Sequence, residues 1–261
     1  MMLADLHIHS TFSDGKLTIP ELVDFYGSRN FGAIAITDHL CEESTVIGKA
    51  ARYLGRTLTP ATFPLYMEIL KSEGERAWDR YRMLLIPGFE LTKNSVSNHR
   101  SAHILGLGIS KYVPSDGDVV DLARAIRSQG GLAVAAHPVH TQKNEKQTYH
   151  LWDRRVELAN ELDAWEVASG PYLFDEVLRT KLPKLATSDL HRPHQINAWK
   201  TVFECELHPE ALLDAIRLQN LSFRFYSEVE PDGVRNWVNV GDLGSSHTHR
   251  GLQHLLNRQA L

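Results

Sequence analysis

The sequence predicts an α/β protein in which the strands of a mostly parallel sheet alternate with helices. Short apolar runs, such as residues 2–6 and 132–136, are typical of buried strands. Amphipathic stretches such as residues 118–129 predict helices between them, and this alternation favours parallel strands joined by crossovers. Histidine and acidic residues follow the ends of several runs, which is where the active sites of parallel α/β barrels lie.

The predicted strands follow one another along most of the chain. They cover residues 2–6, 32–37, 83–87, 102–107, 132–136, 163–167, 184–187, 200–205 and 222–226. Thr18 and Glu21 form a capping-box pattern, which predicts that the first helix begins there. Gly130-Gly131 ends the helix over 118–129, and a later helix is predicted over 209–219.

Two segments stand apart from this alternation. Residues 40–82 are polar and helix-prone, so we expect a helical excursion from one strand–helix connection. No repeat or clear boundary divides the chain. We therefore expect one main domain over residues 1–227, followed by a C-terminal appendage over 228–261.

The composition excludes several classes of protein. A charged fraction of 23% and an apolar fraction of 43% are ordinary for a folded enzyme and exclude a disordered chain. The net charge of −4 provides no global basic field for nucleic acid or anionic membrane. Two cysteines, no basic leader and no apolar run of about 18 residues favour a cytoplasmic protein without a membrane span or a membrane partner.

Histidine is the unusual component, with 14 residues in 261. His7 and His9 end the first predicted strand, where residues two apart point to the same face. These two side chains could therefore bind one metal ion. A second pair, His247 and His249, lies in a polar stretch rich in glycine and serine, and we expect it to be solvated loop.

Further histidine and acidic residues complete a candidate metal site. The candidate ligands are His7, His9, Asp14, His39, Glu90, His103, His137, Asp189 and His191. Imidazole and carboxylate suit zinc, manganese or iron, and nine groups exceed the needs of one catalytic zinc. We therefore expect two or three divalent ions. Two positions leave alternatives: His99 competes with His103, and Asp14 lies in a Ser-Asp-Gly sequence that is also typical of an ordinary turn.

At these residues the sequence resembles the PHP superfamily, named after polymerase and histidinol phosphatase. The matching motifs, in family order, are Asp-Leu-His-Ile-His-Ser (5–10), Ser-Asp-Gly (13–15), Thr-Asp-His (37–39), Gly-Phe-Glu (88–90), Ala-His-Ile-Leu (102–105), Ala-His-Pro (136–138) and Ser-Asp-Leu-His (188–191). The resemblance extends over residues 3–191. It implies a distorted (β/α)7 TIM-like barrel and a metal-dependent phosphoesterase similar to the small stand-alone members.

The resemblance also implies roles for the ligands. His7, His9, Glu90 and Asp189 would hold one ion and form the catalytic set. Glu90 would bridge to a second ion held by His103 and His137, and a third ion would lie between Asp14, His39 and His191. A hydroxide shared by two ions would attack phosphorus. Asp14 stands where several trinuclear members have histidine, which leaves the third ion open.

Other polar residues near the ligands have two interpretations each. Arg192, His194 and Lys200 follow the last ligands and could contact the phosphate or the leaving group, or could belong to a solvated loop. Asp5 and Asp38 could orient the neighbouring imidazoles, or could cap turns.

The leading functional hypothesis is a phosphatase that acts on a small phosphorylated substrate, such as histidinol phosphate or a nucleotide. One alternative is a phosphodiesterase or exonuclease that acts on nucleic-acid ends, which the acidic net charge disfavours. Another is a non-catalytic metal-stabilised module, against which the full ligand set argues. A metal-dependent hydrolase of C–N bonds is the last; such barrels usually bridge their ions with a lysine, whereas here Glu90 fills that role. The oligomeric state is not predicted.

Overall fold

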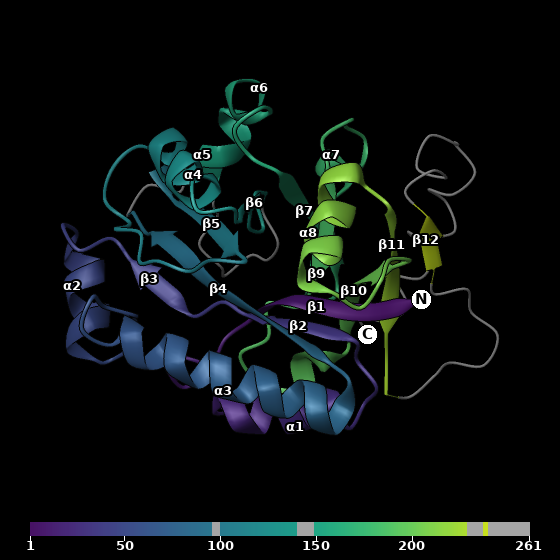
Figure 1. The fold of residues 1–261 in the computed structure, drawn as a ribbon. Helices are drawn as coiled ribbons and strands as arrows, with labels where there is room; N and C mark the ends of the chain where they lie inside the picture. The colour runs from purple at the N-terminus through teal and green to yellow at the C-terminus, as the bar shows by residue number, and fades with distance from the viewer. Residues whose placement is uncertain (96–99, 140–148, 229–236, 240–261) are drawn as a thin grey trace.

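A single sheet runs through the protein and carries helices on its outer sides (Figure 1). The structure, a computed structural model, describes residues 1–95, 100–139, 149–228 and 237–239 of the chain. The strands are β1 (Met2–Ile8), β2 (Ala33–Ile36), β3 (His39–Cys41), β4 (Leu84–Lys93), β5 (Ala102–Leu107), β6 (Leu132–Ala135), β7 (Ala164–Ser169), β8 (Tyr172–Leu173), β9 (Lys184–Thr187), β10 (Ala198–Phe203), β11 (Leu221–Tyr226) and β12 (Trp237–Asn239).

The helices alternate with these strands over most of the chain. They are α1 (Ile19–Gly27), α2 (Val46–Tyr53), α3 (Phe63–Tyr81), α4 (Val119–Arg127), α5 (Tyr149–Asp153), α6 (Arg155–Leu158), α7 (Asp175–Leu178) and α8 (Pro209–Leu218), with a short 3-10 helix, η2, over Pro193–Ile196. The α/β class predicted from the sequence is therefore confirmed.

The prediction of a mostly parallel sheet is wrong, because the sheet is mixed. β1, β2 and β4 are parallel, and β6, β7 and β9 are parallel. β5 runs antiparallel to both β4 and β6, and β10 runs antiparallel to β1 and β11. The reason for the reversal at β5 is the connection: only eight residues, 94–101, join β4 to β5, which is too few for a helical crossover.

The sheet curls, so that the ends of strands far apart in the sequence meet. Ile8 at the end of β1 pairs in parallel with Leu190, just beyond β9. The His9 amide donates to the Leu190 carbonyl at 2.9 Å, and the Leu190 amide donates to the His7 carbonyl at 3.2 Å. These bonds place the segment that follows β9 directly beside the two histidines of β1.

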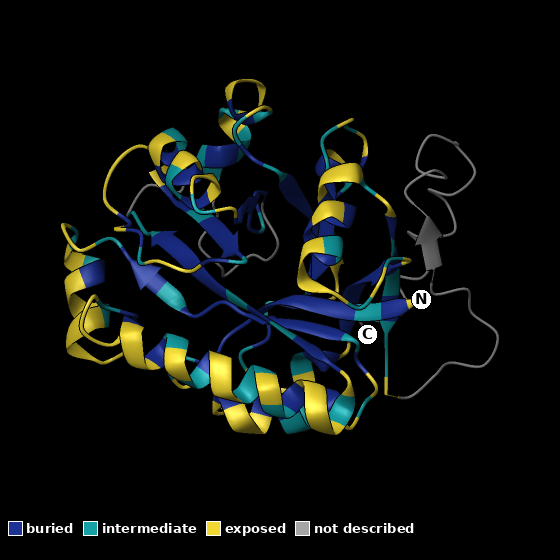
Figure 2. Ribbon diagram, in the orientation of Figure 1, coloured by how far each residue is buried: buried dark blue, intermediate teal, exposed yellow. Residues whose placement is uncertain are grey.

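Helices α1 and α3 lie side by side along one side of the sheet (Figure 1), and their outer faces are exposed while the strands are buried (Figure 2). α1 begins at the predicted capping box, in which Thr18 accepts from the Glu21 amide and Glu21 accepts from the Thr18 amide. The predicted helical excursion over 40–82 is present as α2 and α3. Pro64 is in the first turn of α3, where its missing N–H costs nothing.

Two predictions fall largely outside the described part of the chain. Of the expected appendage over 228–261, the structure describes only Glu228 and β12, which pairs with β11. His247 and His249 lie outside the described residues. Within the residues that are described, no helix has both the length and the apolar character needed to cross a membrane.

A buried ion pair joins β1 to β10 beneath the end of β9. The Lys200 ammonium lies 2.7 Å from Asp5 Oδ2, and both side chains are fully buried. Asp5 also accepts from the Tyr26 hydroxyl and from the amide and hydroxyl of Ser188. Because Asp5 has several donors, the carboxylate is satisfied in the interior, and it fixes the residue that precedes Asp189.

We expect Lys200→Ala to lower the free energy of unfolding by about 3–5 kcal/mol, because it leaves the buried Asp5 carboxylate without its counterion. Urea unfolding of the purified variant measures the loss. Lys71→Ala on the exposed face of α3 is the control, with an expected change within about 0.5 kcal/mol. A loss below about 1 kcal/mol for Lys200→Ala would contradict the proposed role of the pair.

Candidate metal centre

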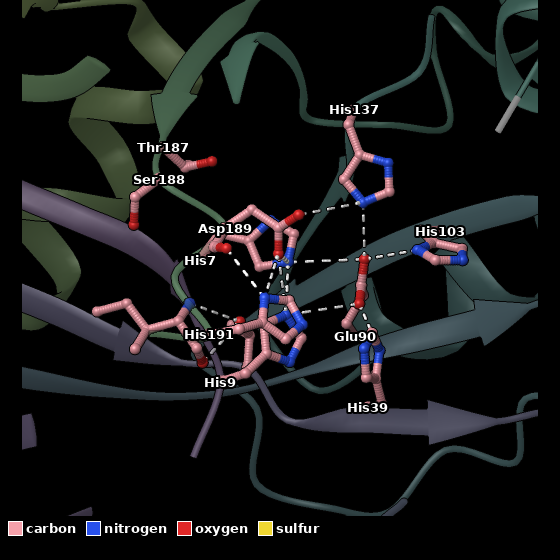
Figure 3. Close-up of polar contacts among 12 residues, drawn as sticks. His7, His9, His39, Glu90, His103, His137, Thr187, Ser188, Asp189 and His191 are labelled. Atoms are coloured by element: carbon pink, nitrogen blue, oxygen red, sulfur yellow. Dashed lines mark hydrogen bonds and ion pairs between the residues drawn. The ribbon is translucent and has the colours of Figure 1, made fainter. Parts of the chain in front are cut away.

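All nine predicted ligands gather in one cluster at the curled end of the sheet. They come from β1, β3, β4, β5 and the segments that follow β1, β6 and β9. Figure 3 shows Glu90 between His39, His103 and His137, with His7, His9 and Asp189 on its other side. Four overlapping sets, each with ligand atoms within 4.8 Å of one another, could hold a metal ion.

His7, His9 and Asp189 belong to two of these sets, which share His7, and lie close to one another. Their closest atoms are the two histidine Nε2 atoms, 3.1 Å apart, and Asp189 Oδ1, which lies 3.3 Å from His7 Nε2 and 3.2 Å from His9 Nε2. Ligands bound at about 2.0–2.1 Å in a tetrahedron are separated by about 3.3 Å. The spacing of these three atoms therefore fits a shared zinc-sized ion.

Glu90 joins the sets, because both of its carboxylate oxygens face imidazoles. Oε1 lies 2.9 Å from His103 Nδ1, 3.3 Å from His137 Nε2 and 3.6 Å from His7 Nε2. Oε2 lies 2.7 Å from His39 Nδ1. The side chain is fully buried. Glu90 is therefore placed where a bridging carboxylate would have to lie.

Asp14 points toward His39 and His191 rather than away from the cluster. Its Oδ1 atom lies 3.1 Å from His191 Nε2 and 3.5 Å from His39 Nε2. With His9 these residues form the third candidate set. The turn around Asp14 is also real: a side chain at Gly15 would place its Cβ 2.1 Å from the His9 carbonyl oxygen, so only glycine fits there.

Two ligands have a backbone conformation that non-glycine residues rarely adopt. His137 has φ of 27° and Asp189 has φ of 53°. Each is held by its neighbours: the His137 amide donates to Glu166 at 2.6 Å, and Ser188 donates to Asp5. Such conformations cost about 1–3 kcal/mol each and concentrate at functional sites.

The electrostatics of the cluster are those of charges crowded into a site with little exposure to solvent. Burial alone would raise the pKa of Glu90, but the surrounding imidazoles, first that of His103, lower it well below its usual value. Burial, together with the charges of His191 and His39, lowers the pKa of His9 to about 3. Burial opposes protonation of His137 too, but the carboxylates of Glu90 and Asp189 outweigh it and raise its pKa to about 9.

Hydrogen bonds alone do not satisfy this cluster. Within the described residues, the buried atoms Glu90 Oε2 and Asp14 Oδ1 accept no well-aligned hydrogen bond. His103 Nε2 lies 3.1 Å from the Asn94 side-chain oxygen, while its Nδ1 atom faces Glu90. A neutral imidazole carries one N–H, so a bond to Asn94 leaves a lone pair facing Glu90. Cations between these atoms resolve both conflicts, and the residues present therefore fit bound divalent metal ions.

Glu166 is a residue of the site that sequence reasoning missed. It is fully buried on β7, and its carboxylate accepts from His7 Nδ1 at 2.8 Å, from Thr187 at 2.6 Å and from the His137 amide. The bond from His7 Nδ1 fixes the tautomer, so that Nε2 is free to face the cluster. In the sequence, Glu166 lies within a mostly apolar run that predicts a buried strand. A glutamate at such a position was the available signal of its role.

The three predicted substrate contacts have different positions. His194 lines a cavity of about 530 Å³ that opens onto His39, His103, His137 and Asp189. Arg192 lines a neighbouring recess. The prediction for Lys200 is wrong, because this side chain is fully buried in the ion pair with Asp5 and lines neither cavity.

The two aspartates beside the ligands organise the backbone and do not contact imidazoles. Asp38 accepts from the amide and hydroxyl of Ser10 and from the hydroxyl of Ser13, which closes the turn after β1. Asp5 holds Ser188 and Lys200. The turn-capping interpretation is therefore correct for Asp38. His99, the alternative to His103, lies outside the described residues.

We expect Glu166→Gln to weaken metal binding by about 10–100-fold, because the amide cannot accept bonds at both of its ends as the carboxylate does. Competition with a coloured chelator measures the affinity. Glu210→Gln, on an exposed turn of α8, is the matched control and should bind metal like the wild type. Equal affinities of Glu166→Gln and wild type would remove Glu166 from the site.

Metal binding should strengthen as pH rises from about 7 to 9. The pKa values of His137 and His191 are both raised to about 9 in the metal-free protein, so below pH 9 an entering ion must displace their protons. Each displaced proton makes the dissociation constant fall by about tenfold per pH unit in this range. Chelator competition at pH 7, 8 and 9 tests this, and a flat profile would contradict it.

The same two histidines should affect the stability of the metal-free protein in the opposite direction. Because their folded pKa values are raised above the ordinary value, their contribution to stability is fully present below about pH 6.5 and is lost as pH rises toward 9. Unfolding of metal-free protein over this range therefore provides an independent check.

A curated relative from Eggerthella lenta, a phosphoribosyl 1,2-cyclic phosphate 1,2-diphosphodiesterase, is 28% identical over 114 residues. Those residues are 44% of this chain but only 34% of that relative, so the match spans about a third of its length.

A solved structure from Bacteroides vulgatus has a similar fold. It is a two-domain protein described as containing a predicted PHP-like metal-dependent phosphoesterase, with a TM-score of 0.67 at 20% identity. The match covers 86% of this chain and 65% of that protein. The sequence profile of the PHP domain matches residues 5–150, which is more than half of the chain. This range includes seven of the nine candidate ligands, from His7 to His137. The chain therefore belongs to the PHP domain family.

Proposed function

We propose that this protein hydrolyses a phosphate ester with the help of two or three divalent metal ions, and that its substrate is a small phosphomonoester. The observation that carries the proposal is the convergence of nine imidazole and carboxylate groups in one partly buried cluster that borders an open cavity. A cluster of this kind is suited to hydrolysis, because metal ions bound there would lower the pKa of water and neutralise phosphate oxygens.

The protein's own residues would prepare the site for that chemistry. His7, His9 and Asp189 would hold one ion, Glu90 with His103 and His137 a second, and Asp14, His39 and His191 a third. Glu166 keeps His7 Nε2 directed inward, and the Asp189 carbonyl oxygen, 3.0 Å from His191 Nδ1, does the same for His191 Nε2. These contacts fix the tautomers before any ion arrives, which reduces the cost of ordering the ligands.

Charge favours a monoester. The ligand set contains only three carboxylates, Asp14, Glu90 and Asp189, so three divalent ions with neutral imidazoles would leave the cluster strongly positive. A phosphomonoester brings two negative charges into the cavity, whereas a diester brings one. The dianion therefore gains more from this field, because the interior of the cluster has a low dielectric constant.

A phosphodiesterase is the second candidate. It rests on the Eggerthella lenta relative, whose name describes the cleavage of a cyclic phosphodiester. The cavity of about 530 Å³ has room for the groups on both sides of a diester. A monoesterase and a diesterase differ in the charge of the substrate, so a paired assay separates them.

We also propose that β1, β2, β4, β5, β6, β7 and β9 form the distorted seven-stranded barrel that the family resemblance implies. The parallel pairing of Ile8 with Leu190 supports this arrangement, because it joins the two ends of that series.

The test is a metal analysis combined with a phosphoesterase panel. We expect protein purified without chelator to contain two or three transition-metal ions per chain, and to hydrolyse p-nitrophenyl phosphate faster than bis-p-nitrophenyl phosphate. Asp189→Asn should lower kcat by about a hundredfold or more, since even the loss of a residue behind a metal ligand costs about 10–100-fold. Its circular dichroism should stay near that of the wild type.

Asp79→Asn, on the exposed end of α3, is the matched control and should keep wild-type activity. If Asp189→Asn retains activity within about tenfold of wild type, Asp189 does not take part in catalysis. If the diester is hydrolysed faster than the monoester, the second candidate replaces the first.

A further inference from the structure

A small basic recess adjoins the metal cluster on the side of Asp14. Its volume is about 320 Å³, and its lining includes Lys16, Arg56 and Arg192. His191 lines both this recess and the larger cavity, so a metal-ligand candidate forms the wall between them. The recess also touches Asp14, the carboxylate of the third candidate set.

The three cations come from separate parts of the chain but are tied to the cluster through its backbone. The Lys16 amide donates to the His191 carbonyl at 2.9 Å, and Arg192 follows His191 directly. Arg56 precedes Thr57 and Leu58, which both donate to the His39 carbonyl, at 3.1 and 2.8 Å. Two ligand backbones therefore position the segments that carry these three exposed side chains.

These cations are available for a ligand. Among the described residues, none of the three has a carboxylate oxygen within 4.0 Å, and their side chains make no hydrogen bond to a protein acceptor. Other arginines of this protein, such as Arg76 and Arg154, are paired with carboxylates. Three unpaired cations in a concave site attract an anion, and guanidinium groups match the geometry of a phosphoryl group.

We propose that this recess binds a second phosphoryl group of the substrate, so that the protein selects phosphate esters that carry two phosphates over esters that carry one. The inference rests on the proposed function, because it assigns the first phosphoryl group to the metal cluster. Lys16, Arg56 and Arg192 are then specificity-determining residues: they hold the remote phosphate while the scissile one lies at the metals.

A homologous series of substrates tests the proposal. Alkanediol monophosphates and bisphosphates with three to six carbons differ only in the second phosphate and in its distance from the first. We expect the wild type to favour one of the bisphosphates over its monophosphate by about tenfold or more in kcat/KM, which is typical of a charge-assisted contact. Arg56→Ala and Arg192→Ala should each reduce this ratio by about tenfold.

Arg52→Ala is the matched control. Arg52 is an exposed arginine four residues before Arg56, outside the recess, and its removal should leave the ratio unchanged. A ratio within about twofold of unity for every chain length, or an equal ratio in wild type and Arg56→Ala, would overturn the proposal. In both cases hydrolysis of the monophosphates still reports on the proposed function by itself.

Calorimetric binding keeps the proposal testable if none of these esters is hydrolysed. The wild type should then still bind a diol bisphosphate more tightly than its monophosphate, and Arg56→Ala should lose that preference. A 5′-phosphorylated oligothymidylate distinguishes the source of the second phosphate. If it binds more tightly than every diol bisphosphate, the recess recognises a nucleic-acid strand and the proposed small-molecule substrate is wrong.

Discussion

A carboxylate without access to solvent dominates the interior of this protein. Glu90 is fully buried, and the imidazoles of His7, His39, His103 and His137 face it at 2.7–3.6 Å. A buried charge costs several kcal/mol unless it is paired. Protonated imidazoles can balance it only partly, because burial opposes their charge and they repel one another; burial, then the charges of His191 and His39, lowers the pKa of His9. Divalent cations would balance the charges of Glu90 and the neighbouring carboxylates, and the surrounding residues form four sets that could hold such ions.

A second ring of contacts surrounds the ligands and meets this constraint. Glu166 joins β1, β6 and β9 by accepting from His7, His137 and Thr187. Asp5 and Lys200 do the same beneath Ser188. These contacts hold His137 and Asp189 in their unusual backbone conformations, so packing in the outer ring offsets strain at the ligands.

Local pattern predicts much of this fold, and long-range pairing limits the rest. Apolar runs and the capping box at Thr18 indicated the main strands and α1, because these depend on neighbours in sequence. The direction of β5 depends on the short connection from β4 to β5. The pattern of apolar runs predicts where strands lie but not in which direction they run. A lysine in a strand is normally exposed, so the sequence does not predict that Lys200 is buried. Its burial depends on the ion pair with Asp5, which lies 195 residues away in the sequence. Glu166 was missed for the same reason: its three partners lie far along the chain, and within its strand it is one more residue of an apolar run.

The basic recess and the third ligand set share one backbone, which links specificity to metal binding. The Lys16 amide donates to the His191 carbonyl, and the segment after Arg56 donates to the His39 carbonyl. Gly15 lies so close to the His9 carbonyl that the turn before Lys16 has no room for a side chain at this position. The residues that would hold the third ion therefore share backbone contacts with the segments that carry the cations of the recess. Asp14 stands at this junction, where it touches both the imidazoles and the recess. The choice of carboxylate at this position would then affect the occupancy of the third ion and the recognition of the substrate together, because both depend on the same few bonds.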